Sequence, residues 1–381
     1  MIKKNLSLLS RRSFIKNAAG VAALAPLGLT KPIKRRKPDF PFVDGLCLAI
    51  PSTPDEDFAA SGLSALIADV SQATQLKTTD GSIRYWRTFE ACSSSIVQAR
   101  QLLRTKKRAF LATRGSDIKE AFRQGKTAVF LQFQGCEPLG EDPSRIDLFY
   151  ELGLRILQIT HHNNNPFGGG CIEKNWMGLT KLGFEAVERM NAIGIIADLS
   201  HVADPTSLDV LRASRKPVIL SHGACRAIVN NARCASDEVI RGIARTGGAM
   251  GIFMMSFWLT NNSAPNLDAL IKQLRHIIKI GGIDTAAIAN DYPLSGEPNL
   301  VKLKNNNTEG VKDYLDWWRS VGKQGVLGFD KDPQHVVIPE LNNINRMFTI
   351  HAALEKSGFK LTEIEKIMGG NWLRVLTESL G

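Results

Sequence analysis

The residues of this 381-residue chain that could do chemistry gather at the ends of apolar runs. Four of the seven histidines and two carboxylates close or follow such runs, each at the carboxyl end of a segment expected to form a strand. In a parallel barrel the carboxyl ends of the strands meet on one face, so these side chains are expected to lie close together. The candidates are Glu137, His161, His162, His201, His222 and Asp291.

This combination of side chains indicates a hydrolytic metal site. Two imidazoles and a carboxylate are a ligand set used for catalytic zinc, and they leave a coordination position open for water. The metal lowers the pKa of that water toward neutrality. One histidine at a strand end is more often structural, but several in register favour a site over that simpler interpretation.

The elements that must position these residues alternate along the chain. Eight segments predict strands, at 43–50, 82–89, 127–133, 153–160, 194–199, 217–221, 247–254 and 285–290. Helical patterns lie between or after them, at 116–125, 181–193, 205–214, 236–245, 266–280, 339–357 and 361–367. The alternation predicts an α/β fold with a parallel sheet covered on both faces. Eight repeats over about 250 residues favour a (β/α)8 TIM barrel, here with extra C-terminal helices.

The net charge of +11 is a property of the N-terminal segment. Residues 1–37 hold ten of the 48 basic residues and no acid, so 38 basic and 37 acidic residues remain after them. The rest of the chain therefore lacks the basic excess of a protein that binds a nucleic-acid backbone, and we expect no nucleic-acid partner.

The same segment resembles a twin-arginine export signal. The run "SRRSFIK" at 10–16 precedes a twelve-residue apolar stretch, 18–29, which is too short to cross a bilayer comfortably. Residues 1–37 are therefore expected to be an export signal and basic linker, and 38–381 a single domain. Pro26 follows the A-x-A candidate at 23–25, so a retained N-terminal anchor stays open.

Several motifs together resemble the membrane (renal) dipeptidase family, peptidase family M19. They are "GCEPLG" (135–140), "LQITHHNNNPF" (157–167), "IGIIADLSHV" (193–202), "KPVILSHGACR" (216–226), "NNARCASDEVI" (230–240) and "GGNWLRVL" (369–376). The likeness runs in order over roughly residues 40 to 378. It implies a TIM barrel of the metal-dependent amidohydrolase type with a two-zinc centre that hydrolyses dipeptides.

The resemblance also assigns roles to single residues. Glu137 matches the carboxylate that bridges the two metals, and His201 and His222 match the imidazoles of one metal. His161 matches the histidine that contacts substrate and can polarise the scissile carbonyl. Arg233 matches the arginine that binds the substrate carboxylate, and a guanidinium fork suits two carboxylate oxygens. Asp291 matches the aspartate that shuttles a proton to the leaving amine.

The first strand departs from the family pattern. Where the family reads D-G-H-x-D, this chain has Asp44, Gly45, Leu46, Cys47 and Leu48. Side chains alternate along a strand, so positions 46 and 48 share a face and Cys47 points away from it. The two residues that in the family bind only the first metal are therefore missing. About one Zn²⁺ per chain is expected, held by Glu137, His201 and His222.

Two functions compete on this basis. The first is an exported one-metal hydrolase of dipeptides or similar small amides in the bacterial periplasm or envelope. The second is a dipeptidase-like binding protein, a pseudoenzyme that has lost turnover. The expected partners are a dipeptide-like small molecule and the twin-arginine export machinery, and a homodimer stays open. The six cysteines form no C-x-x-C pair and are expected to be buried free thiols.

Overall fold

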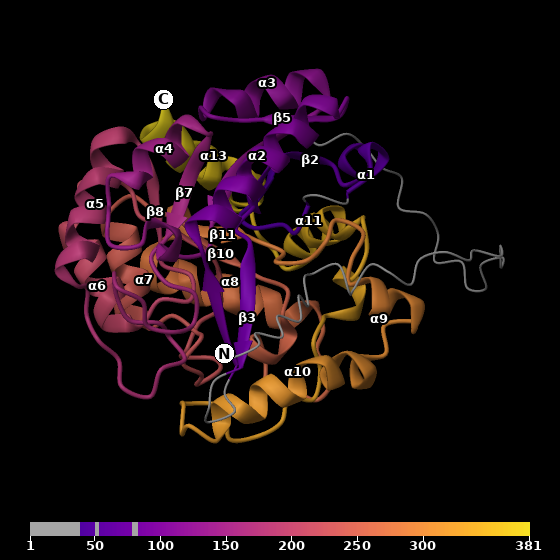
Figure 1. Ribbon diagram of the computed structural model, residues 1–381. Coiled ribbons are helices and arrows are strands. Elements are labelled where there is room, and N and C mark those ends of the chain that lie inside the picture. The colour runs from indigo at the N-terminus through magenta and orange to yellow at the C-terminus, as the bar shows by residue number, and fades with distance from the viewer. Residues whose placement is uncertain (1–38, 50–52, 78–82) are drawn as a thin grey trace.

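Eight parallel strands form a barrel that backbone contacts close. Helices surround these strands (Figure 1). The computed structural model describes residues 39–49, 53–77 and 83–381. The predicted export signal therefore lies outside the described residues. The barrel strands are β1 (Phe42–Asp44), β2 (Leu63–Asp69), β6 (Thr127–Phe133), β7 (Leu154–Gln158), β8 (Ile196–Asp198), β9 (Leu220–Gly223), β10 (Met250–Ile252) and β11 (Ala286–Ile288).

Backbone contacts close the barrel at two points. The strands pair in the orders β1-β2-β6-β7-β8 and β9-β10-β11. A bridge between Asp198 and Ile219 joins the first group to the second. At the other edge the amide of Gly45 donates to the carbonyl of Ile288 at 2.9 Å, which joins β1 to β11. The predicted (β/α)8 barrel is confirmed.

Helices cover the outside of the strands. Figure 1 shows α5 and α6 on one side of the barrel, α11 on the other, and α10 and α9 at the lower end. The helices are α1 (Asp55–Ala60), α2 (Phe89–Thr105), α3 (Ser116–Gln124), α4 (Arg145–Glu151), α5 (Lys181–Ile193), α6 (Asp204–Ala213), α7 (Asp237–Arg245), α8 (Leu267–Gly281), α9 (Pro298–Lys302), α10 (Asn307–Gly322), α11 (Arg346–Lys356), α12 (Leu361–Glu365) and α13 (Asn371–Leu380).

The second barrel strand is not the predicted one. The segment predicted at 82–89 forms β4 (Ile83–Arg87), which pairs antiparallel with β3 (Ala73–Lys77) in a hairpin separate from the barrel strands. Its place is taken by β2, all seven residues of which are buried. A further strand, β5 (Ala109–Leu111), pairs with the first residues of β6. The run "LSALIAD" has few β-branched residues, and only pairing with β1 and β6 makes it a strand.

The C-terminal helix α13 packs into the barrel. Trp372 is fully buried in the same apolar cluster as Val43, Leu46 and Ile67, and its indole N–H donates to the carbonyl of Ile288 at 2.9 Å. A Cβ on Gly45 would lie 2.4 Å from this indole, so glycine is required where β1 passes the ring. Part of the motif "GGNWLRVL" therefore fills the barrel interior.

The six cysteines are all buried free thiols, as predicted. Among residues 39–49, 53–77 and 83–381, no helix is both long and apolar enough to cross a membrane.

Candidate metal centre

Three imidazoles meet at the carboxyl ends of β7 and β8. One ligand atom from each of His161, His162 and His201 lies within 4.8 Å of the other two. The Nδ1 atoms of His162 and His201 are 3.0 Å apart, and the rings of His161 and His201 stack with centroids 4.3 Å apart. We call these residues the three-imidazole cluster.

His222, at the carboxyl end of β9, extends the cluster in the other direction. Its Nε2 atom lies 2.8 Å from Nε2 of His201. Its Nδ1 atom lies 2.8 Å from Oγ of Ser221, and that hydroxyl donates to Oδ2 of Asp198 at 2.6 Å. Histidine ligands of metals are commonly oriented by a partner of this kind on the second ring nitrogen. Asp198 and Ser221 therefore fix the orientation of His222 and, through it, of His201.

Burial keeps these rings neutral. Desolvation, with added repulsion from the buried guanidinium of Arg233, lowers the pKa of both His201 and His222 well below the ordinary histidine value. Desolvation likewise lowers the pKa of His161 and His162. Since a neutral imidazole is the form that binds a metal, the four rings have the chemistry of metal ligands at neutral pH.

The backbone is unusual at three of the candidate residues. His162, His201 and Asp291 have φ values of 67°, 64° and 59°, in the left-handed region that side chains other than glycine rarely adopt. Such residues cost on the order of 1–3 kcal/mol each and cluster at functional sites. The fold therefore maintains an unfavourable backbone at the strand ends where chemistry was predicted.

Glu137 is not one of the three residues whose ligand atoms all lie within 4.8 Å of one another. Its carboxylate packs against the backbone of Gly135, and its buried Oε2 has no hydrogen-bond partner among the described residues. Desolvation raises the pKa of this carboxyl, and the charge of Arg87 opposes the rise. Within the predicted set of Glu137, His201 and His222, the Nε2 atoms of the two histidines lie 2.8 Å apart, and the role of Glu137 stays a prediction.

Arg87, which the sequence reasoning did not consider, is a buried cation near this site. It ends β4, and its Nε donates to Oγ of Ser71 at 2.9 Å. Ser71 is held in turn by Asp69 at the end of β2, with Oγ 2.6 Å from Oδ1. A lone arginine in a hairpin gives no sequence signal of its own, because only the folded chain places its charge beside Glu137 and His161.

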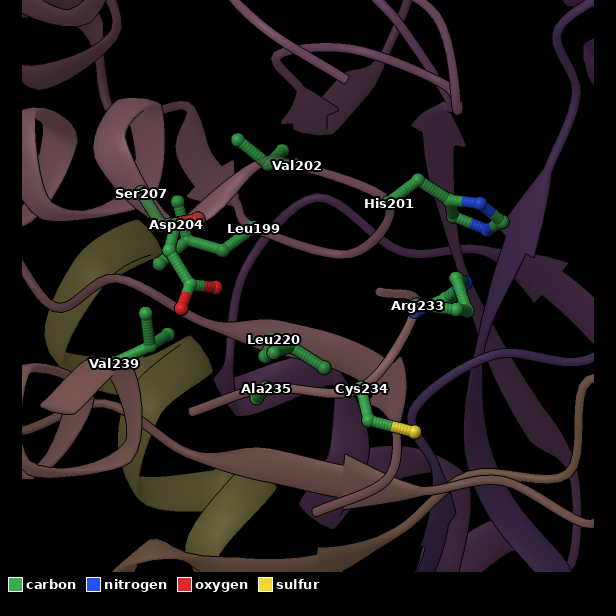
Figure 2. Close-up of a pocket in the computed structure, with 10 residues that line it drawn as sticks. All are labelled: Leu199, His201, Val202, Asp204, Ser207, Leu220, Arg233, Cys234, Ala235 and Val239. Carbon is green, nitrogen blue, oxygen red and sulfur yellow. The ribbon is translucent and has the colours of Figure 1, made fainter. Parts of the chain in front are cut away.

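Arg233 lies beside His201, as Figure 2 shows. Its guanidinium is buried, lies over the rings of Phe253 and Trp258 at 5.2 and 5.6 Å, and donates from Nη2 to the carbonyl of His222 at 3.2 Å. Within the described part of the chain its Nε has no hydrogen-bond partner. Figure 2 also shows a small cavity that is lined by His201 and Arg233 and, from α6, by Asp204 and Ser207.

Asp291 and the first strand meet at the closure of the barrel. The amide of Asp291 donates to the carbonyl of Leu46 at 2.8 Å, and the Asp291 side chain is half-buried. β1 ends at Asp44, earlier than predicted, because the Asp44 side chain accepts from the amides of Leu46 and Asn290. Leu46 still points into the barrel interior, Cys47 packs outside it, and Leu48 is half-buried.

Comparison with known proteins gives the family. Residues 58–309, more than half of the chain, match the family model described as membrane dipeptidase, peptidase family M19. This chain belongs to the membrane dipeptidase family.

Two curated dipeptidases are similar to this chain over part of their length. Dipeptidase tcpJ from Claviceps purpurea (strain 20.1) is 29% identical over 275 residues, which are 70% of this chain and 55% of tcpJ. Dipeptidase verJ from Clonostachys rogersoniana is 30% identical over 186 residues, 48% of this chain and 47% of verJ. The chain thus spans about half the length of these relatives.

Solved structures agree on the fold of the dipeptidase family. An amidohydrolase from Pseudomonas aeruginosa superposes with a TM-score of 0.73 at 26% identity, over 90% of this chain and 97% of that one. A metallo peptidase from Rhodobacter sphaeroides, liganded with a phosphinate mimic of L-Ala-D-Ala, gives 0.69 at 16% identity, over 89% and 99%. The second likeness shows the fold alone.

Aromatic side chains, among them Trp317 of α10, pack beside the histidines of this site. Most of α10 follows the residues that match the family model. The ring of Trp317 lies 5.3 Å from that of His162, and Trp317 also contacts Trp258 and Phe329. The residues "DWW" (316–318) lie in a segment without family motifs, so the sequence gives no reason to place these rings at the site.

Proposed function

We propose that this protein is a metal-dependent hydrolase of dipeptides or similar small amides, with one zinc ion per chain. The observation that carries the proposal is the three-imidazole cluster, whose ligand atoms lie within 4.8 Å of one another beside buried Arg233 in a member of the membrane dipeptidase family. The dipeptide class is carried over from the names of the curated relatives, tcpJ and verJ.

The donor set fits zinc. The rings are neutral and face one another, and His222 is oriented through Ser221, which is the arrangement that zinc ligands need. By the family resemblance the ion would be held by His201, His222 and Glu137. A zinc ion supplies Lewis acidity, which polarises a carbonyl group and makes water acidic enough to act as a nucleophile near neutral pH.

The remaining residues are proposed to bind substrate and move the proton. Arg233 offers an unpartnered buried Nε to the substrate carboxylate, while the rings of Phe253 and Trp258 hold the guanidinium. Half-buried His161 would contact the scissile carbonyl. Asp291 would take a proton from the attacking water and deliver it to the amine nitrogen as the C–N bond breaks.

The test combines metal content with turnover. Purified protein is loaded with excess Zn²⁺, desalted and analysed for zinc, and the same sample is assayed on a panel of dipeptides. We expect about one ion per chain and slow hydrolysis that is lost on chelation and regained with zinc. Protein that retains no ion and cleaves no dipeptide would contradict the proposal.

A binding protein without turnover is the second candidate, and the observation that favours it is the pair of leucines at 46 and 48. Leu46 belongs to the apolar interior of the barrel, so this edge of the site offers no ligand from β1. For this candidate, calorimetry would detect dipeptide binding that depends on Arg233, while the hydrolysis assay stays at background.

We also propose export to the periplasm or envelope by the twin-arginine route, supported by "SRRSFIK" and the apolar run after it. Replacing Arg11 and Arg12 by lysine should hold the protein in the cytoplasm. A variant with Lys3 and Lys4 replaced by arginine is the matched control and should be exported. Export of the Arg11→Lys, Arg12→Lys variant at the normal rate would refute this route.

A further inference from the structure

Trp317 of α10 packs against a histidine of the site, yet it lies beyond the residues that match the family model. We propose that Trp317 selects substrates whose C-terminal residue carries a large apolar side chain. This inference rests on the proposed hydrolase function and names the substrate class of that same site.

Six side chains of the site contact one another in a closed ring. In order they are Arg233, Trp258, Trp317, His162, His201 and His222. The guanidinium of Arg233 lies 5.6 Å from the centre of the Trp258 ring, and the rings of Trp258 and Trp317 have centroids 6.5 Å apart. Trp258 and Trp317 therefore connect Arg233 to His162 by one route, whereas His222 and His201 connect them by the other.

The roles proposed for these residues place the C-terminal residue of a substrate inside this ring. Its carboxylate would pair with Arg233, whose buried Nε has no hydrogen-bond partner among the described residues. The scissile amide would lie at His201 and His222, the proposed zinc ligands. Only one residue separates the carboxylate from the scissile bond, so both ends of it lie within the ring. Because the scissile bond occupies the imidazole side, the side chain of that residue is left with the side formed by the two indoles.

The indole of Trp317 is free to move and admit such a side chain. Trp317 is half-buried and packs edge-on against Phe329, and its N–H has no hydrogen-bond partner in the described part of the chain. The neighbouring Trp318 is buried, and its N–H donates to the carbonyl of Lys331 at 2.7 Å. Trp317 can therefore part from His162 without breaking a side-chain hydrogen bond to any described residue, whereas Trp318 is anchored.

A wall of indole rings favours apolar side chains over polar ones. Contact with the rings removes apolar surface of the substrate from water, whereas a polar side chain in the same place loses water without matching hydrogen bonds. In a hydrophobic pocket even one methylene group changes kcat/KM by about 10–200-fold. A leucine side chain should therefore be preferred to an asparagine side chain of nearly the same shape by at least about tenfold.

The test is this preference, measured in the wild type and in variants of Trp317. We measure kcat/KM of the zinc-loaded full chain for alanyl-leucine and alanyl-asparagine. The wild type should prefer alanyl-leucine by at least about tenfold. Trp317→Ala should bring the two values close together, mainly by raising KM for alanyl-leucine, and Trp317→Phe, which keeps an aromatic ring, should retain the preference. Trp86→Ala, which removes an exposed indole from β4, is the matched control.

A measurement without turnover separates this inference from the proposed function. N-acetylleucine and N-acetylasparagine carry the same carboxylate and side chains, and their binding to the metal-free full chain is measured by calorimetry. Tighter binding of N-acetylleucine that is lost in Trp317→Ala would support the inference even where the wild type cleaves no dipeptide, a result that would remove the function alone.

Two results would overturn the inference. The first is a wild type that shows no preference for the leucine compound in either measurement. The second is a wild-type preference that persists when Trp317 is replaced, because Trp317 would then be a packing residue only. Trp317→Gln is measured beside Trp317→Ala, so that the failure of one variant to fold leaves the other to decide, and it should also lose the preference.

Discussion

Removing the hydroxyl of Ser221 should weaken zinc binding without touching a ligand. The hydroxyl lies 2.8 Å from Nδ1 of His222 and 2.6 Å from Oδ2 of Asp198, so it is the link between the carboxylate and the row of imidazoles. In Ser221→Ala the His222 N–H would be buried without a partner, which costs about 1–3 kcal/mol. This matches the 10–100-fold loss of affinity typical of such orienting partners, roughly 1.4–2.7 kcal/mol.

The assay is titration of the protein with Zn²⁺ in competition with a chromophoric chelator, and Ser200→Ala is the matched control. The Ser200 hydroxyl donates to the other oxygen of Asp198 at 2.9 Å and accepts the backbone amide of His222 at 3.0 Å, but it bonds to no ring nitrogen. We expect Ser200→Ala to bind zinc nearly as the wild type does. Equal losses of zinc affinity in the two variants would mean that Asp198 affects zinc binding through the stability of the whole fold and not through the His222 ring. That result would refute the prediction.

Three further predictions concern the groups around this row. Asp291→Asn should lower dipeptide turnover by roughly 10²–10⁴-fold while zinc content is unchanged, measured by kcat and metal analysis together; full activity would exclude Asp291 as the proton shuttle. Leu46→His with Leu48→Asp should raise zinc content from about one to two ions per chain and make the melting temperature zinc-dependent, whereas Leu46→Met should do neither. Burial raises the pKa of Asp44 from 3.8 to about 6 in the folded protein. The protonated Asp44 therefore stabilises the folded state fully below pH 4, and this stabilisation is lost as the pH rises through 6. In urea unfolding of the metal-free protein, the free energy of unfolding of Asp44→Asn should therefore rise by about 3 kcal/mol relative to that of the wild type between pH 4 and 7. A difference that does not change with pH would refute this.

The fold was predictable because most barrel strands carry a strong local signal. Segments such as 127–133 and 153–160 are apolar runs with turn residues on both sides, and they became β6 and β7. The second strand was not predictable in this way. Its sequence is rich in alanine and leucine, whereas the more β-like 82–89 forms a hairpin, and the difference arises from pairing with strands far away in the chain.

The strand-end histidines were predictable from the sequence, whereas their arrangement was not, and their roles stay predictions. Strand-end positions indicated His161, His201 and His222, and the structure brings these rings together. The position of His162 depends on a left-handed backbone held by the loop around Gly170, which no periodicity reveals. Arg87 and Trp317 come from a hairpin and from α10, so their place at the site follows from tertiary packing alone.

The closure of the barrel bears on how a metal can be lost during evolution. Where β1 meets β11, the contacts use the main chain of Gly45 and Leu46 and the side chain of Asp44, and no contact requires a polar group at position 46. A leucine at position 46 adds apolar surface to the barrel interior. Replacing a metal-binding residue by leucine at this position would therefore not destabilise the fold. The reverse mutation buries an imidazole that only a bound ion would satisfy. In descent from a two-metal ancestor, loss of the first ion would then be easier than its recovery. Recovery would require enough zinc to stabilise the protein once the ligand residues are restored.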